Sequence, residues 1–242
     1  MSKTYDELKE KFEKIAREHN LFSEKVLIKA FPLTPEEAIG NPSDLDYPLV
    51  RGRERLMEAT FKGAKGQAFT DLYGNFEGTI RDVLNIETTN DYRRAIFIAT
   101  LNAVLRGLNL ITNTIHCKND EPRECAKNAV KFIKENYGNP KVFLVGFQPR
   151  FAEFFSQNFQ LRITDLDREQ IGKNINGTIV EDETSAEKNI RWADILWVTG
   201  TTIVNDTISQ FLNQNKPTIF YGTTIAGTAY LLGLKRFCSV SK

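Results

Sequence analysis

Long apolar stretches and a surplus of positive charge are both absent from this chain of 242 residues. No run of roughly 18 uncharged apolar residues occurs, so no membrane-spanning helix is expected. The first twenty residues have no apolar core of the kind that signal peptides carry. Lysine and arginine total 32 against 31 aspartates and glutamates, a formal net charge of +1, which is too balanced for a protein that binds phosphate backbones. We therefore expect a cytoplasmic protein that binds neither membranes nor nucleic acid.

Cysteine and histidine are scarce, with three and two residues respectively. An odd, sparse cysteine count indicates reduced thiols rather than a disulfide framework. The only place where metal-ligand types gather is His116-Cys117, with Cys125 shortly after. A tetrahedral zinc site needs four ligands, and two adjacent residues of an extended chain point to opposite sides. The pattern thus allows a metal site at His116, Cys117 and Cys125, with packing of the thiols as the alternative.

The N-terminal part, residues 1–112, reads as an α+β domain. Apolar residues at spacings of three and four predict an amphipathic helix over 4–19 and a long one over 89–108. A strand is predicted over 26–31, and two strands over 55–70 are joined by Lys62-Gly63-Ala64 as a hairpin.

From residue 113 to 242 the pattern changes to alternating strands and helices, which predicts a Rossmann-like α/β domain with a parallel sheet. Short β-rich apolar runs, typical of strands buried on both faces, occur at 142–147, 161–165, 194–199 and 218–221. Helices are expected between and beside them at 122–136, 149–157, 185–191, 204–214 and 225–232. The fold class is therefore α/β, with a smaller α+β domain in front.

Ligands of open parallel sheets bind beyond the carboxyl ends of the strands. The first such loop begins with Gly146, where backbone can approach a ligand, but it lacks the G-x-G-x-x-G pattern, so NAD is not expected. The second carries Asp165 and Asp167, which could accept hydrogen bonds from ligand hydroxyls or could simply cap a turn.

The third and fourth loops repeat one motif, Gly-Thr-Thr-Ile, at 200–203 and 222–225. Glycine permits a positive φ, and a helix that starts there offers free N–H groups to an anion. Capping and turning without a ligand is the alternative. We expect these GTTI loops to contribute most of the ligand-binding residues, namely Thr199, Gly200, Thr201, Thr202, Asn205, Gly222, Thr223 and Thr224.

Basic residues crowd the predicted hairpin: Arg51, Arg53, Arg55, Lys62 and Lys65. Charged hairpin tips are common, so the arginines read as a solvated face, whereas Lys62 and Lys65 are candidates to hold an anionic group over a cleft. Asn102 lies on the apolar stripe of the long helix and must be hydrogen-bonded if it is buried, so it could tie the two domains together.

These segments together resemble a prokaryotic family of unknown function that carries the label "putative heavy-metal chelation". The resemblance is carried by residues 51–71, Asn102-Ala103, 116–120, 146–149, 165–167 with Ile171-Gly172, and the two GTTI loops. It implies an enolase-N-terminal-like domain followed by a Rossmann-like domain, with a ligand site between them. It also implies a link to metal chelation through a pterin- or anthranilate-like molecule, and a metal-chelating small molecule is the only cofactor that it suggests.

Three functions remain open from the sequence. The chain could bind an anionic or pterin/anthranilate-like small molecule in an interdomain cleft, with or without catalysis, since no nucleophile or base stands out. It could bind metal directly through cysteine and histidine. It could also be a non-catalytic assembly unit in which a sheet edge or an apolar helix pairs two copies as a homodimer.

Overall fold

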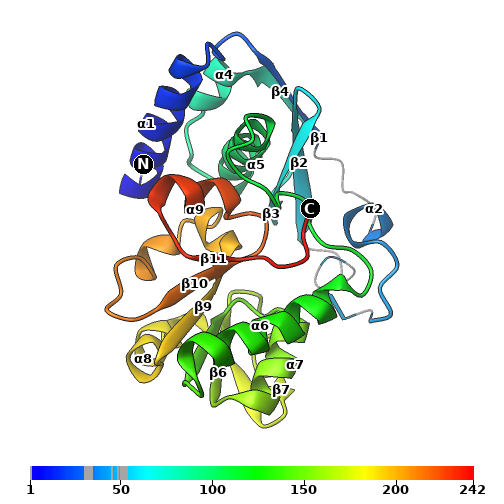
Figure 1. Cartoon of the computed structure of the whole chain (residues 1–242), viewed down its shortest axis with the longest axis vertical. Coiled ribbons are helices and arrows are strands. Elements are labelled where there is room, and N and C mark those ends of the chain that lie inside the picture. The colour runs from blue at the N-terminus through cyan, green and yellow to red at the C-terminus, as the bar shows by residue number, and fades with distance from the viewer. Residues whose placement is uncertain (1, 30–34, 45, 48, 50–53) are drawn as a thin grey trace.

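The computed structural model describes residues 2–29, 35–44, 46, 47, 49 and 54–242. Among these residues no helix is long and apolar enough to cross a membrane. Two sheets organise the chain: an antiparallel one in the upper half of Figure 1 and a mostly parallel one in the lower half.

The antiparallel sheet has the strand order β3-β2-β1-β4. Its strands are β1 (Lys25–Lys29), β2 (Arg55–Phe61), β3 (Ala64–Thr70) and β4 (Phe76–Thr79), and its helices are α1 (Lys3–Glu18), α4 (Ile80–Leu84) and α5 (Asp91–Gly107), with α2 (Pro35–Ile39) to one side. The predicted long helix and the 55–70 hairpin are confirmed. The strand predicted over 26–31 is confirmed up to Lys29, and the rest of it, like Arg51 and Arg53, lies outside the described residues.

Helix α5 packs directly on the sheet and is buried along most of its length. The backbones approach so closely that a Cβ at Gly66 of β3 would lie 2.1 Å from the backbone N of Ala103. Helix α1 closes the same core, where the rings of Tyr5 and Phe12 each meet Phe97 edge-on at 5.8 Å. Only glycine at position 66 permits this packing.

The second sheet has the order β11-β10-β9-β5-β6-β8-β7, parallel except for β7. Its strands are β5 (Val142–Val145), β6 (Leu161–Asp165), β7 (Asn174–Ile175), β8 (Thr178–Asp182), β9 (Ile195–Thr199), β10 (Thr218–Tyr221) and β11 (Arg236–Phe237). If the five long strands are numbered by their order in the chain, their order across the sheet from β8 to β10 is 3-2-1-4-5. This is the Rossmann arrangement. The order of connection reverses between β5 and β9, so the switch point lies there.

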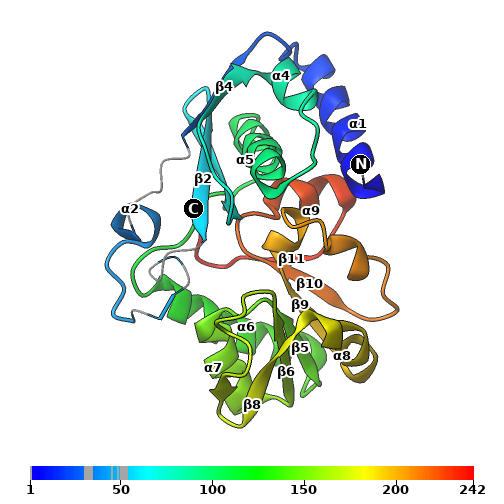
Figure 2. The ribbon, with the colours of Figure 1, turned by 180° about the vertical axis from the view of Figure 1, so that it is seen from behind.

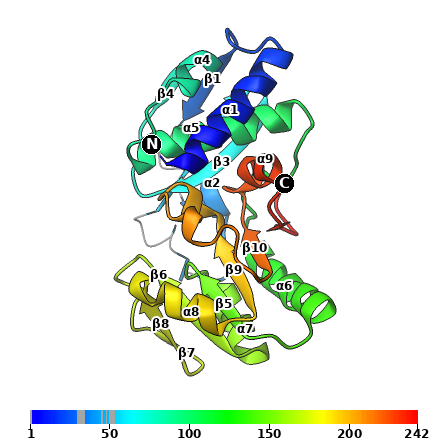
Figure 3. The ribbon, with the colours of Figure 1, turned by 90° about the vertical axis from the view of Figure 1, so that its left-hand side faces the viewer.

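Alternate residues of these strands pack on opposite faces of the sheet. Val142 and Leu144 join the core under α6 (Glu121–Tyr137) and α7 (Pro149–Asn158). Phe143 and Val145 join the core shared with α8 (Ala186–Trp192), α9 (Ala226–Leu232) and the helices of the N-terminal part. Helix α9 lies between the parallel sheet and the helices α1 and α5 (Figure 3). The expected α/β class, with a parallel sheet and crossover helices, is confirmed.

The change from one sheet to the other falls between α5 and α6, where the sequence places the domain boundary. Figure 2 shows the two sheets from behind. That residues 1–112 and 113–242 are separate domains stays a prediction. Strands β4, β7, β8 and β11 were not predicted, because they are short or carry polar residues on both faces.

One predicted helix is wrong. Residues 204–214 form short turns rather than an α-helix, with 3₁₀ turns at Gly200–Ile203 and Ile208–Gln210. Asp206 and Asn213 have φ angles of 59° and 56°, and the Oδ1 of Asn205 accepts hydrogen bonds from the N–H and hydroxyl of Thr207. Local side-chain hydrogen bonds of this kind compete with the helical ladder.

Candidate functional site

A cavity of about 600 Å³ lies at the carboxyl ends of β5, β6, β9 and β10. The loops after these strands line it, and so do residues of the N-terminal part and of the segment that joins the two parts. Of the residues predicted to bind a ligand, eleven line the cavity: Gly146, Asp165, Asp167, Thr199, Gly200, Thr201, Thr202, Asn205, Gly222, Thr223 and Thr224.

Gly146 and Thr199 mark the switch point between β5 and β9. Gly146 has φ +83°, and a Cβ there would lie 2.7 Å from the Cγ2 of Thr199. Asp165 at the end of β6 fixes this loop: its carboxylate accepts hydrogen bonds from the backbone N–H of Phe147 and, at 2.7 Å, of Asp167. Burial raises the pKa of Asp165, although these hydrogen bonds oppose the shift. The carboxylate therefore shapes the turn and also lines the cavity.

Most threonine hydroxyl groups at the first GTTI loop form hydrogen bonds with neighbouring residues of the same loop. The Oγ1 atoms of Thr199 and Thr201 lie 3.0 Å apart, and Thr202 donates to the carbonyl of Thr199 at 2.7 Å. A Cβ at Gly200 would lie 2.9 Å from the backbone N of Ile225 and 3.0 Å from the carbonyl O of Tyr221. Gly200 is thus needed for the packing of the two GTTI loops on each other.

The second GTTI loop leaves one hydroxyl free. The Oγ1 of Thr224 accepts a 3.1 Å hydrogen bond from the backbone N–H of Phe69 in β3, which links the two sheets. The side chain of Asn102 donates to the carbonyls of Thr223 and Thr224, so the expected tie between the two parts is confirmed. The hydroxyl of Thr223 is buried and has no partner, although Thr223 lines the cavity.

The other two predicted residues lie elsewhere. Lys62 and Lys65, in the hairpin at the far end of β2 and β3, pair with Glu24 at 2.9 Å and Glu58 at 2.8 Å. Neither belongs to the described residues that line the cavity. The N-terminal part reaches the cavity through the opposite ends of these strands, with Glu54, Phe69, Thr70 and Asp71.

Glu54 was missed by the sequence analysis, which weighed only the arginines around it. Burial, followed by the charges of Asp165, Asp167 and Asp71, raises the pKa of Glu54 to about 7. Its carboxyl makes no hydrogen bond or ion pair with the described residues. A single acid among three arginines at the start of a strand was the one signal available.

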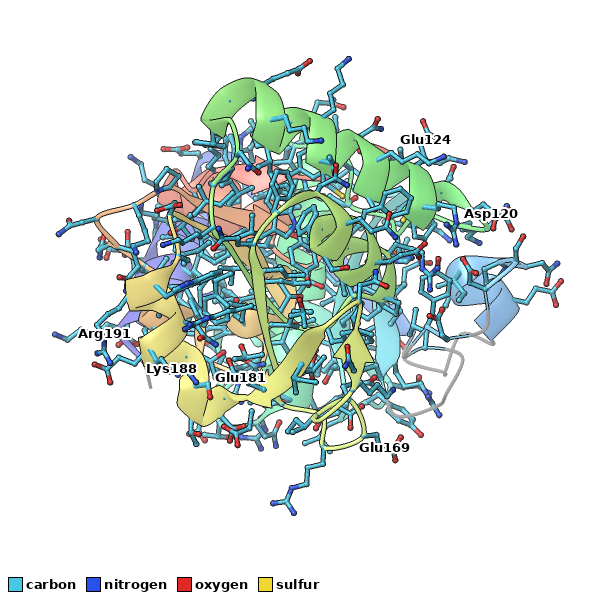
Figure 4. All side chains as sticks on the ribbon, turned by 90° about the horizontal axis from the view of Figure 1, so that it is seen from below. Asp120, Glu124, Glu169, Glu181, Lys188 and Arg191 are labelled. Atoms are coloured by element: carbon cyan, nitrogen blue, oxygen red, sulfur yellow. The ribbon has the colours of Figure 1, made fainter. Side chains whose placement is uncertain are left out.

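A segment that we call the strap, the described residues from Pro35 to Leu49, covers one side of the cavity. Ile39, Tyr47 and Leu49 line it. Arg150, which is buried, pairs with Asp46 and, at 3.2 Å, with Asp44. The carboxylate of Asp120 accepts hydrogen bonds of 3.1 Å from the N–H and hydroxyl of Ser43; Figure 4 shows Asp120 beside α2, far from the surface pair Glu181 and Lys188.

The three cysteines meet at the end of the cavity near the strap. Cys117, Cys125 and Cys238 all line it, together with His116. Burial raises the pKa of Cys117 and raises that of Cys125 to about 11, and each thiol is also affected by Cys238. Burial lowers the pKa of His116 to about 4, and its Nδ1 is buried without a partner. At neutral pH, Cys117 and Cys125 are therefore neutral thiols and His116 is a neutral imidazole.

These residues do not fit a metal ion held by the protein alone. Within the described part of the chain, no three histidine, cysteine, aspartate or glutamate side chains are placed to hold one. Thiols with a raised pKa are also poor ligands, because the thiolate is the form that binds metal.

The fold and the cavity define a two-sheet α/β protein with a small-molecule-sized cavity at the switch point of a Rossmann-ordered sheet. Residues 128–230 match the model of the DUF364 family, described as "Putative heavy-metal chelation". The match confirms the resemblance to this family over residues 128–230, while the enolase-N-terminal-like domain stays a prediction.

Two solved structures of DUF364 proteins of unknown function resemble the chain. The one from Pyrococcus horikoshii has a TM-score of 0.59 at 13% identity and covers 91% of this chain and 79% of its own. The one from Desulfitobacterium hafniense has a TM-score of 0.54 at 13% identity, with coverages of 74% and 73%. At this identity the likeness concerns the fold. No curated protein matches the sequence.

Proposed function

We propose that this protein binds a planar small organic molecule in the cavity at the β5/β9 switch point. The volume of about 600 Å³ falls within the range of about 300–1,000 Å³ that ligand pockets occupy. Aromatic side chains supply much of the wall: Tyr47, Phe69, Phe147, Phe151, Phe211, Tyr221 and Phe237. Flat rings of a ligand would pack well against them.

A heteroaromatic ligand is better supported than a simple anion. The anion hypothesis relied on helices that begin at both GTTI loops, but the first loop is followed by 3₁₀ turns and the second by the seven-residue α9. Lys62 and Lys65, the cations expected to hold the anion, lie away from the cavity. Of the two ring systems considered from the sequence, the anionic anthranilate loses this support and a pterin-like ring remains. A chelating ring of this kind would connect the cavity to the family's label without any protein ligand to a metal.

The free hydroxyl of Thr223 is the observation that carries the proposal. Thr223 is 1% exposed and its Oγ1 has no partner. A buried hydroxyl without a hydrogen bond destabilises a folded protein by about 1–3 kcal/mol. A threonine at this place on the cavity wall is explained if a bound ligand forms the missing hydrogen bond.

The test compares two threonine-to-valine variants. Thr228, in α9, is also buried with an unpartnered hydroxyl, but it does not line the cavity. Both Thr223→Val and Thr228→Val should match or exceed the wild type in stability, because each removes an unsatisfied polar group. Only Thr223→Val should weaken the binding of pterin, followed by its fluorescence, by about fivefold or more.

Equal pterin affinity in both variants would remove the role given to Thr223. Absence of pterin binding to the wild type, together with native mass spectra that show no retained small molecule, would overturn the proposed function itself.

Direct metal binding through His116, Cys117 and Cys125 is the alternative that the sequence left open, and the placement of these side chains does not support it, although all three line the cavity. Elemental analysis of protein purified without an affinity tag decides it. One equivalent of a soft metal that is lost in Cys117→Ala would establish the direct site. A metal that leaves together with a small molecule on dialysis, with Cys117→Ala unchanged, would support the bound chelator instead.

A further inference from the structure

The charges that face the cavity are unbalanced. Among the described lining residues, the carboxylates far outnumber the single arginine, Arg168. The acids are Glu54, Asp71, Asp91, Asp165, Asp167 and Glu183. Asp91 is paired with Arg94, but Glu54 and Asp71 have no ion pair with the described residues. The described residues thus make the field inside the cavity negative, and a negative field favours a cation.

Three of the other acids act on Glu54. It precedes Arg55, which pairs with Thr70 across the β2-β3 ladder, so Glu54 and Asp71 leave the sheet side by side. From the parallel sheet, Asp165 and Asp167 face the same carboxyl and raise its pKa, in addition to burial and Asp71. Burial raises the pKa of Tyr221 in β10, and the negative charges of Asp165 and Glu54 raise it further. The acids of the two sheets thus converge at one point.

Asp165 cannot turn away from Glu54, because its two oxygens accept from the N–H groups of Phe147 and Asp167. Like charges held together in a poorly solvated place repel each other, and either a proton or a bound cation must relieve the repulsion. Two uncharged polar atoms on the same cavity wall also lack partners, the hydroxyl of Thr223 and the Nδ1 of His116. The cavity therefore offers acceptors for N–H groups along with its negative charge.

Building on the proposed function, we propose that Glu54 and Asp165 select ligands that present a positively charged nitrogen group, such as an amidine or a protonated ring nitrogen of a heteroaromatic compound. A planar amidine presents two parallel N–H groups, which match the geometry of a carboxylate. Binding of the cation keeps Glu54 ionised, so affinity rises with pH as Glu54 loses its proton.

The test uses three compounds of one shape: benzamidine, benzamide and benzoate, which are positive, neutral and negative at pH 6–8. Their dissociation constants are measured by saturation-transfer NMR with the wild type, with Glu54→Gln and with Glu77→Gln, which changes an exposed glutamate away from the cavity. We expect the wild type at pH 8 to bind benzamidine about tenfold more tightly than benzamide, and benzoate most weakly. Glu54→Gln should lose most of this preference, whereas Glu77→Gln should keep it.

The pH dependence gives an independent result on the unmodified protein. Benzamidine should bind more tightly at pH 8 than at pH 6, while benzamide, which has no charge, should bind equally at both. This comparison tests the selection of positively charged ligands even if Glu54→Gln fails to fold.

The outcomes separate the two proposals. If benzamide or benzoate binds the wild type as tightly as benzamidine, the charge selection is overturned while ring binding in the cavity stands. If Glu54→Gln keeps the full preference, Glu54 is not the selecting group. If none of the three compounds binds and pterin does not bind either, the proposed function fails with the inference.

Discussion

The side-chain oxygen of Asn102 accepts a 2.7 Å hydrogen bond from the backbone N–H of Gly227. A Cβ at position 227 would lie 2.9 Å from that oxygen, so glycine permits the approach. The amide nitrogen of Asn102 donates to the carbonyls of Gln67, Thr223 and Thr224. One buried side chain on α5 thus binds β3, the second GTTI loop and the first turn of α9 together.

Removal of this amide should destabilise the protein strongly. In Asn102→Ala, several buried backbone groups lose their partner at once, and we expect a loss of about 3 kcal/mol in the free energy of unfolding, measured in urea. Asn136, whose exposed side chain bonds the carbonyl of Phe132 within α6, is the matched control. Asn136→Ala should lie within about 0.5 kcal/mol of the wild type. A similarly small effect of Asn102→Ala would contradict the role assigned to this residue.

Replacement of Gly200 should also affect the fold, and not the ligand alone. Because its Cβ would press on backbone atoms of Ile225 and Tyr221, Gly200→Ala should cost about 2 kcal/mol. At Gly74 the Cβ would meet only the ring of Tyr92, at 3.1 Å, so Gly74→Ala should cost less than about 0.5 kcal/mol. Thermal unfolding of the two variants measures the difference, and equal melting temperatures would show that the GTTI loops can separate freely.

The position of the cavity could be predicted from sequence because it follows from parallel strands alone. Once β5, β6, β9 and β10 are placed, the residues after each of them meet at one edge, and Gly146, Asp165 and the GTTI loops do so. The helix over 204–214 failed because Asn205 and Thr207 bond locally, and hydrophobic periodicity does not register such bonds. The predicted anion site loses the support that this helix was expected to give it.

The other wall of the cavity could not be predicted, since it depends on how distant segments dock. The end of the β2-β3 hairpin that faces the parallel sheet is the one with Glu54 and Asp71, whereas the sequence drew attention to Lys62 and Lys65 at the other end. No local sequence pattern determines which end of the hairpin faces the parallel sheet. That choice is made by contacts such as Thr224 to Phe69 and Arg150 to Asp46, whose partners lie more than a hundred residues apart.

Arg150 should hold the strap to α7 and thereby complete the cavity. It is buried, it pairs with Asp44, Asp46 and Glu153, and its guanidinium lies 5.8 Å from the ring of Tyr47. In Arg150→Met, Asp46 loses its cation, whereas Asp44 and Glu153 keep Arg123 as a partner. We expect a loss of about 2 kcal/mol in the free energy of unfolding together with faster proteolysis between Asn41 and Leu49.

Arg17, which is exposed, pairs with Glu13 and lies 5.5 Å from the ring of Phe22, is the control for loss of a surface ion pair. Arg17→Met should change the free energy of unfolding by less than about 0.5 kcal/mol and leave the proteolysis pattern intact. If Arg150→Met is digested at the same rate and at the same sites as Arg17→Met, the strap does not depend on Arg150.

The pKa of Glu54 makes stability depend on pH in a defined direction. The carboxyl ionises near 4.5 in the unfolded chain and at about 7 in the folded protein, so between these values the folded state holds a proton that the unfolded state has lost. The free energy of unfolding should therefore fall as pH rises from about 4.5 to 7 and should not recover above it. The shift corresponds to about 3 kcal/mol at most, since the cavity admits some solvent.

Glu54→Gln removes this titration while keeping the shape of the side chain. Its free energy of unfolding relative to the wild type should rise between pH 5 and pH 8, by about 2 kcal/mol. Urea denaturation at the two pH values measures the change. Comparison with the wild type cancels the contribution of every other titrating group whose pKa does not depend on Glu54. The groups around Glu54 are Asp71, Asp165, Asp167 and Tyr221. Glu77→Gln should show no such rise. A constant difference between Glu54→Gln and the wild type would mean that Glu54 is already ionised at pH 5, and that the carboxylates of the cavity are relieved by a cation rather than by a proton.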